Sequence, residues 1–109
     1  MTPVCLLLIF INEADLWVDT PLFEAVVKRL RELGVAGATA QLGLMGFGHH
    51  HQLHEKRLFG MSGDRPVTVT AVDEEAKIRE AVPAIRAMVE QRLMVMLLAE
   101  RMPLDDEAR

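Results

Sequence analysis

The spacing of apolar residues along the chain predicts most of its strands and helices. Residues 4–11 form an unbroken apolar run, which is typical of a strand that is buried on both faces. Apolar residues recur every three or four positions over 22–33 and 78–89, as they do in amphipathic helices. Over 67–72, apolar residues alternate with threonine, which indicates a strand with one polar face.

Two further segments complete the pattern. Residues 39–45 are predicted as a strand, and Gly43 within it indicates a bulge or a close backbone approach. Residues 93–99 are predicted as the last strand, with a continuing helix as the alternative because leucine and methionine dominate there. The resulting order β-α-β-β-α-β predicts an α+β, ferredoxin-like fold, with one antiparallel sheet and two helices on one of its faces.

Proline, glycine and polar residues predict where the helices begin and end. Thr20 and Pro21 are predicted to start the first helix, as its N-cap and its first helical residue. Gly34 is predicted to end this helix in a left-handed conformation. Asp73 is predicted to cap the second helix, and Pro83 to kink that helix or split it in two.

The first and last strands are apolar on both faces, although two helices on one side leave the other face of the sheet bare. A bare apolar face is typical of a protein interaction site. We therefore expect a homo-oligomer in which this face packs against other subunits. A single domain is expected over residues 1–102, followed by a polar, frayed tail over 103–109.

Composition narrows the class of protein. The 109 residues suffice for one domain, and a net charge of −4 argues against a nucleic-acid-binding surface. The one cysteine, Cys5, lies in the apolar run and is interpreted as a buried hydrophobe in a reducing compartment. Residues 4–11 are too short to span a bilayer and lack the features of a signal peptide, so a soluble, cytoplasmic protein is expected.

Candidate chemistry gathers in the long loop that is predicted over residues 46–64. Gly46 and Gly48 could bring backbone N–H groups close to a ligand, or could simply shape the turn where the strand ends. The loop also contains His49, His50, His51, His54, Lys56 and Arg57. Arg57, with Arg92 and Arg101 near the C-terminus, could neutralise phosphate groups, with solvated surface charge as the alternative.

The histidines also raise the question of a metal site. Imidazole ligands suit zinc, copper or nickel, and His50 and His54 would share a face if the loop were helical. However, contiguous histidines do not easily converge on one ion, and no cysteine accompanies them. A solvated loop, or one that contacts a nucleotide, is therefore preferred, and no metal ligand is assigned.

Short motifs in a fixed order resemble those of one family. They are PLFEAVV at 21–27, GAT at 37–39, GFG at 46–48, then His54, Ser62, Asp64, Pro66 and Val72-Asp73. Over residues 7–89 the chain thus resembles the PII-like group known as domain of unknown function 190, relatives of the PII signalling proteins. His54 coincides with one of the motif positions, so a structural or ligand role is expected for it.

The resemblance implies a homotrimer of ferredoxin-like subunits whose sheets face the three-fold axis. It implies an adenine nucleotide (ATP, ADP or AMP) as effector in the clefts between subunits. It also implies that the loop over 46–64 changes shape and engages a membrane transporter or channel, or a cytosolic enzyme. Two features differ from PII proteins: the chain has no tyrosine for uridylylation, and Val72–Glu75 stands where their glycine-rich phosphate-binding turn would be. Arg92 stands where the family usually has glycine before the last strand.

The expected function is therefore that of a trimeric PII-like regulatory protein that binds a small effector. The residues expected to bind ligand are Gly46, Phe47, Gly48, His49, His50, His54, Arg57, Arg92 and Arg101. The alternative is a divalent-metal-binding trimer similar to CutA proteins, using the loop over His49–His54. An enzyme is not expected, because the chain has no HExxH motif, no P-loop and no plausible Ser-His-Asp or Cys-His arrangement. Slow nucleotide hydrolysis is the less favoured alternative.

Overall fold

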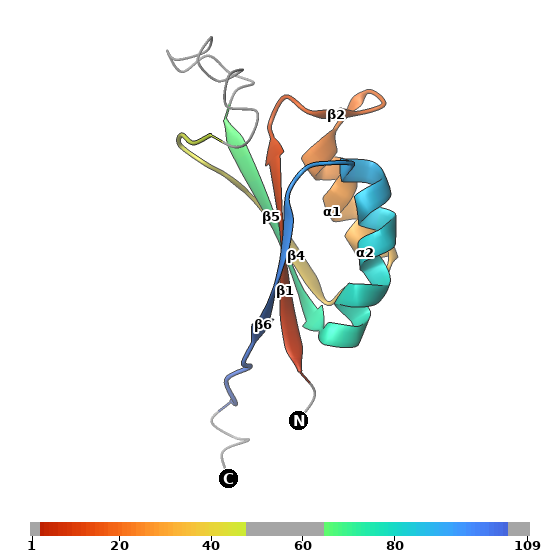
Figure 1. The fold of residues 1–109 in the computed structure, drawn as a ribbon, viewed down its shortest axis with the longest axis vertical. Coiled ribbons are helices and arrows are strands. Elements are labelled where there is room, and N and C mark those ends of the chain that lie inside the picture. The colour runs from red at the N-terminus through yellow and green to blue at the C-terminus, as the bar shows by residue number, and fades with distance from the viewer. Residues whose placement is uncertain (1–2, 48–64, 105–109) are drawn as a thin grey trace.

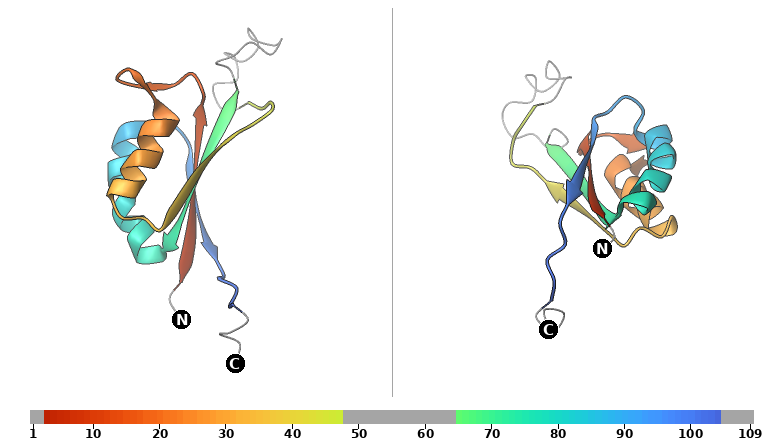
Figure 2. Two further views of the ribbon diagram at one scale, coloured as in Figure 1. Left: turned by 180° about the vertical axis from the view of Figure 1, so that it is seen from behind. Right: turned by 60° about the horizontal axis from the view of Figure 1, so that its bottom comes forward.

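The computed structural model describes residues 3–47 and 65–104 of the chain. Within these residues the elements are β1 (Val4–Asn12), β2 (Leu16–Trp17), β3 (Thr20–Pro21), α1 (Leu22–Glu32), β4 (Gly37–Leu42), β5 (Pro66–Glu74), α2 (Glu75–Val89) and β6 (Met94–Ala99). An antiparallel sheet has the strand order β4-β5-β1-β6, and β2 and β3 form a separate hairpin. Both described helices lie on one face of the sheet (Figure 1, Figure 2). The α+β, ferredoxin-like fold is confirmed, and its last segment is a strand rather than a helix.

The core lies between the helices and the face of the sheet that they cover. Alternate residues of β1 and β5 point into it, and the register places Leu7 opposite Ala71 and Ile9 opposite Val69. The apolar stripes of both helices complete this core, as their spacing predicts. The buried apolar residues are Cys5, Leu7, Ile9, Ile11, Leu22, Val26, Leu30, Val67, Val69, Ala71, Ile78, Ala81, Ile85, Met88 and Val89.

The other face of the sheet is left uncovered by the described elements. Leu6, Leu8 and Phe10 alternate with the core residues of β1, so they point away from the helices. The neighbouring strands add Thr68, Thr70 and Val72 of β5, and Val95 and Leu97 of β6. We call these eight residues the open face. Phe10 is 40% exposed and Leu97 45% exposed, so a single subunit presents a largely apolar surface to water.

Helix α1 begins at Leu22, so the prediction that Thr20 caps it is wrong. Thr20 and Pro21 instead pair with Trp17 and Leu16 in the β2–β3 hairpin, which keeps both residues in an extended conformation. Pro21 occupies the N-cap position, and no side chain there bonds to the helix. At the other end of α1, Gly34 has a φ of 84°, which confirms its predicted left-handed conformation.

Helix α2 departs from prediction at Asp73, and of the two outcomes predicted at Pro83 it excludes the split. Asp73 does not cap it, because β5 extends to Glu74 and the helix begins at Glu75. The Asp73 carboxylate instead accepts hydrogen bonds from the backbone N–H of Ala36 at 2.9 Å and of Glu74 at 2.6 Å. Pro83 does not split the helix, which is continuous to Val89. Pro83 lies on the exposed side of α2. Water can therefore bond to the backbone carbonyl that is left without a partner because proline has no N–H.

Candidate functional site

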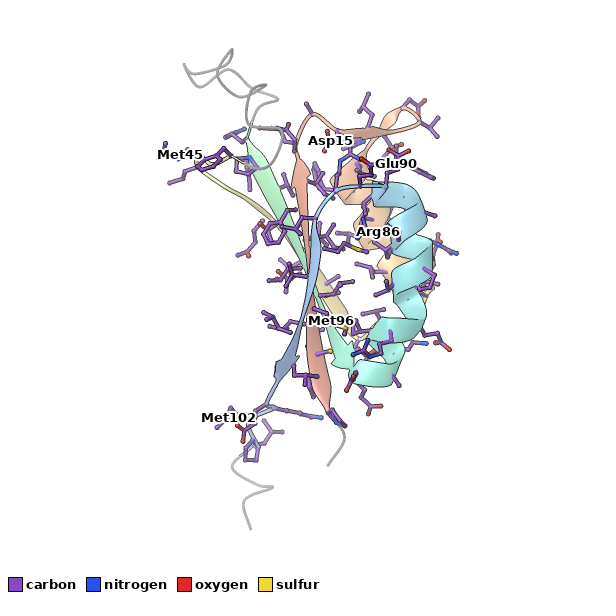
Figure 3. All side chains as sticks on the ribbon, in the orientation of Figure 1. Asp15, Met45, Arg86, Glu90, Met96 and Met102 are labelled. Carbon is purple, nitrogen blue, oxygen red and sulfur yellow. The ribbon has the colours of Figure 1, made fainter. Side chains whose placement is uncertain are left out.

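The chain leaves and re-enters the sheet at one end, between β4 and β5. Leu42 pairs with Val67, and the backbone N–H of Gly43 donates to the carbonyl oxygen of Pro66 at 2.7 Å. The ladder ends there because Pro66 has no N–H to offer in return, and β4 is shorter than the predicted strand over 39–45. Beyond it, residues 44 and 45 bend away from the sheet with Met45 pointing outward, and the chain returns at Gly46, where an added Cβ would lie 3.3 Å from Pro66 Cγ (Figure 1, Figure 3). We call residues 43–47, Arg65 and Pro66 the loop base.

Gly43 lies too close to Pro66 to carry a side chain. A Cβ on Gly43 would lie 2.8 Å from Cγ and 3.3 Å from the carbonyl oxygen of Pro66. The close approach predicted at Gly43 is thus confirmed.

We expect Gly43→Ala to lower the free energy of unfolding by about 1–3 kcal/mol, because the added methyl group forces the loop base apart. Gly37→Ala is the control at the start of β4, since its Cβ would lie in ordinary contact with Val72 Cγ1 of the neighbouring strand, at 3.4 Å. Urea denaturation of both variants checks this prediction. Equal stability of the two would show that the contact with Pro66 is easily relieved.

An ion pair fixes the point where β5 begins. Arg65 donates from Nε to Glu13 Oε1 at 2.8 Å and from Nη2 to Oε2 at 3.4 Å. The Arg65 backbone N–H also donates to Oε1, at 3.2 Å, and the Glu13 N–H donates to the Arg65 carbonyl at 2.9 Å. Hydrogen bonding and the charge of Glu13 raise the pKa of Arg65 above its usual value. The guanidinium therefore keeps its charge at neutral pH, and its contribution is lost only as the pH rises into the strongly alkaline range.

A second ion pair lies two residues further along the same segment. Arg92 Nε donates to Asp15 Oδ2 at 2.8 Å, and the same oxygen accepts the backbone N–H of Asn12 at 2.9 Å. Only 23% of the Asp15 side chain and 29% of the Arg92 side chain are exposed. Arg92 Nη1 also donates to the carbonyl of Val89, the last residue of α2, at 3.1 Å. The segment from Glu13 to Asp15 therefore connects the loop base to the turn between α2 and β6.

Among the described residues, the structure keeps the chain neighbours Gly46 and Phe47 together and separates both from Arg92, at the other edge of the sheet, and from Arg101. Gly46 and Phe47 belong to the loop base and are exposed, Phe47 by 82%. Arg92 lies at the same end of the sheet, but its guanidinium is occupied by Asp15. Arg101 is exposed beyond the end of β6, at the opposite end, because β6 runs antiparallel to β1 and leads away from the loop base. Within one subunit, Arg101 and the loop base therefore do not share a site.

Several predictions fall on residues that the structure does not describe. Gly48, His49, His50, His54 and Arg57 lie outside the described residues, as does most of the predicted tail over 103–109. Among the residues that are described, no group of three or more histidine, cysteine, aspartate or glutamate side chains could hold a metal ion. The roles predicted for the histidines stay predictions.

Glu13, Asp15 and Arg65 are not among the residues that the sequence predicts to bind ligand. Two acidic residues two positions apart, directly after a buried strand, were the available signal. Their partners lie 52 and 77 residues away in the chain, so only the sheet register shows which arginine each acid meets. Glu13 and Asp15 form ion pairs with Arg65 and Arg92, so these charges are already paired, and the two ion pairs hold the loop base in place.

Comparison with known proteins places the chain in a family. The model of the family DUF190, described as "Uncharacterized ACR", matches residues 4–101. The chain belongs to the DUF190 family. A UPF0166 protein of Aquifex aeolicus is 31% identical over 81 residues, which cover 74% of this chain and 77% of that protein. The resemblance inferred from the motifs is therefore confirmed.

Solved structures share the fold of this DUF190 chain at low sequence identity. CutA1 of Ehrlichia chaffeensis, a divalent ion tolerance protein, has a TM-score of 0.65 and 9% identity, over 99% of this chain and 92% of that one. CPII of Thiomonas intermedia is a nitrogen regulatory PII-like protein, bound in its structure to ADP, AMP and bicarbonate. Its TM-score is 0.60 at 21% identity, over 89% of this chain and 84% of that one. At these identities the likeness establishes the fold alone.

Proposed function

We propose that this chain is the subunit of a PII-like regulatory homotrimer that binds an adenine nucleotide in the clefts between its subunits. The observation that carries this proposal is the open face. Its apolar residues, Leu6, Leu8, Phe10, Val72, Val95 and Leu97, lie on three adjacent strands. A contiguous apolar surface of this kind is typical of a protein interface, and a closed ring of subunits would cover it in every copy.

The position of the loop base supports a ligand site at the boundary between subunits. In the described sheet, β4 is an edge strand, so Gly46 and Phe47 lie at the margin of the subunit. The missing side chain of Gly46 faces Pro66, but Gly46 and Phe47 are both exposed, so a ligand could reach the backbone there. The ADP and AMP bound to CPII, which shares this fold, favour an adenine nucleotide as the ligand.

The proposed mechanism needs no covalent step. A nucleotide that binds one conformation more tightly than another shifts the population toward it, and residues 46–64 would then engage a partner. That partner would be a membrane transporter or channel, or a cytosolic enzyme, and the protein itself would be cytoplasmic. No helix in the described part of the chain has the length and apolar character needed to cross a bilayer.

We expect an adenine nucleotide to raise the melting temperature of the purified, metal-free protein. A ligand at one hundred times its dissociation constant stabilises the folded state by about 2.7 kcal/mol. A thermal-shift panel of ATP, ADP, AMP, bicarbonate and Zn²⁺ measures this, with the guanine nucleotides as a control for base recognition. The absence of any shift with adenine nucleotides at millimolar concentration would contradict the proposed effector.

The same panel tests the alternative, metal-binding function. Stabilisation by Zn²⁺ without stabilisation by any nucleotide would favour it. In that case, changing His49, His50 and His51 together to alanine should abolish the Zn²⁺ effect and leave the assembly intact. Retention of the Zn²⁺ effect in this variant would rule out the histidine loop as the metal site.

A further inference from the structure

Asp15 is the point at which two turns meet. Its carboxylate accepts hydrogen bonds from Arg92 Nε and from the backbone N–H of Asn12. Its backbone carbonyl accepts the N–H of Leu22, at the start of α1, at 2.8 Å. One residue thus anchors both ends of the segment that carries the β2–β3 hairpin, and it binds that segment to the turn between α2 and β6.

The turn between α2 and β6, on the Arg92 side of the ion pair, is held by hydrogen bonds from Arg86 and Arg92. Arg86 Nη1 donates to the carbonyl oxygens of Glu90 and Arg92, the latter at 2.8 Å. Arg92 returns a hydrogen bond from Nη1 to the carbonyl of Val89. Figure 3 shows Asp15, Arg86 and Glu90 at the same end of the subunit. Arginine side chains therefore satisfy the last carbonyls of α2, and one of these arginines is itself held by Asp15.

Both turns contain a residue in an unfavourable backbone conformation. Val18 has a φ of 59° and Glu90 a φ of 58°, and these are the non-glycine residues with positive φ in the described part of the chain. Val18 is the first of two residues between the paired Trp17 and Thr20, where hairpins that need a positive φ favour glycine. A β-branched residue with positive φ is strained, and such strain persists only where surrounding contacts impose it.

The Asp15–Arg92 ion pair is the contact that joins these two strained turns. Asp15 lies three residues before Val18, and Arg92 lies two residues after Glu90. Apart from its contacts with α1, the hairpin has little else to impose its shape, because Leu16, Trp17 and Val18 are 63%, 41% and 86% exposed. Loss of the pair would therefore let both turns relax, each toward a less strained backbone.

We propose that the Asp15–Arg92 pair is a conformational clasp, which makes the β2–β3 hairpin and the α2–β6 turn one two-state unit. A ligand or partner that engages one of the turns would then change the other. The exposed apolar tip of the hairpin, from Leu16 to Val18, would move with the clasp. This proposal does not rest on the nucleotide or on the trimer, and it can be tested without any ligand.

Trp17 supplies the first measurement, because it is the only tryptophan in a chain that has no tyrosine. We expect Arg92→Gln to increase the quenching of Trp17 fluorescence by acrylamide, although the altered residue lies in another element. Arg79→Gln is the matched control: Arg79 Nε donates to Glu75 Oε2 at 2.8 Å near the other end of α2. Unchanged Trp17 quenching in Arg92→Gln would overturn the proposal.

Amide hydrogen exchange supplies the second measurement. Two amides report on the two sides: the N–H of Leu22 on the hairpin, and the N–H of Phe10, which donates to Leu93 after the α2–β6 turn. We expect both to exchange about tenfold faster in Arg92→Gln and in Asp15→Asn. The N–H of Glu75, which donates to Pro3 at the other end of the sheet, should not change. Faster exchange on one side alone would show two independent turns and would overturn the clasp.

A third variant keeps the test decisive if the first two do not fold. Glu90→Gly relieves the strain in the α2–β6 turn and keeps Asp15 and Arg92. Because Glu90 Oε1 also lies 3.8 Å from Arg92 Nη1, Glu90→Gln, which loses that charge and keeps the strain, is its control. If the turns form one unit, exchange at Leu22 should slow together with exchange at Phe10. Exchange at Leu22 that stays at the wild-type rate while Phe10 slows would contradict the coupling.

Discussion

Replacing Leu8 by aspartate is expected to dissociate the proposed homotrimer into single subunits. Leu8 lies on the open face, with Thr70 of β5 on one side and Val95 of β6 on the other. In a trimer packed through this face, the new carboxylate would leave water without gaining a partner. We expect the dissociation constant of the assembly to rise by at least about a thousandfold. Sedimentation velocity over a range of protein concentrations measures it.

Ala76→Asp is the matched control for this variant. It adds the same charge at an exposed position in the first turn of α2, where a carboxylate favours the helix dipole. The control should assemble as the wild type does, and circular dichroism should show that both variants are folded. Leu8→Asp subunits that still assemble would mean that the open face is not the interface. A wild-type protein that is monomeric at all concentrations would contradict the trimer itself.

The apolar run over residues 4–11 shows how far the sequence alone could reach. An unbroken run predicted that both faces of β1 would be buried, and hence that subunits would associate. It could not say which residues meet the helices, since Leu8 and Ile9 are equally apolar. The sheet register decides this: Ile9 pairs with Val69 and faces the helices, while Leu8 pairs with Thr70 on the open face. The threonines of β5 therefore lie beside the apolar residues of β1 on the open face.

The two wrong predictions of helix caps have a common physical cause. Thr20 and Asp73 both have side chains that cap helices well, and both precede a helical apolar stripe. In the folded chain, however, each residue is held in a strand. Thr20 pairs with Trp17, and Asp73 pairs with Cys5 in the extended β5. Local capping preferences are worth about 1 kcal/mol, so pairing between strands can override them.

The site was harder to predict than the fold. Gly46 and Phe47 follow β4 and Arg92 precedes β6, so these predicted ligand residues share one end of the antiparallel sheet but lie at its opposite edges. The involvement of Glu13 and Asp15 depends on contacts between residues far apart in the chain. The separation of Arg101 from that end follows only from the direction of β6.

Replacing Ile9 by alanine is expected to lower the free energy of unfolding by about 2–5 kcal/mol. Ile9 is completely buried, next to Leu8 in the chain but on the opposite face of β1. It pairs with Val69 and Met94 between the sheet and the two helices. The substitution removes apolar surface from the core and leaves a cavity that the surrounding sheet closes only in part. Denaturation in urea at a fixed protein concentration measures the loss.

Ile9→Val provides a graded control, with an expected loss of about 0.5–1.5 kcal/mol. Leu8→Ala provides a control on the other face, because it shortens a neighbouring side chain without opening the core. If one face of β1 forms the core and the other the interface, Ile9→Ala lowers the stability of each subunit, and the assembled mass stays that of the wild type wherever the protein is folded. Leu8→Asp lowers the assembled mass and leaves each subunit folded. A loss of assembly in Ile9→Ala at denaturant concentrations where its subunits remain folded would show that core and interface are not separable in β1.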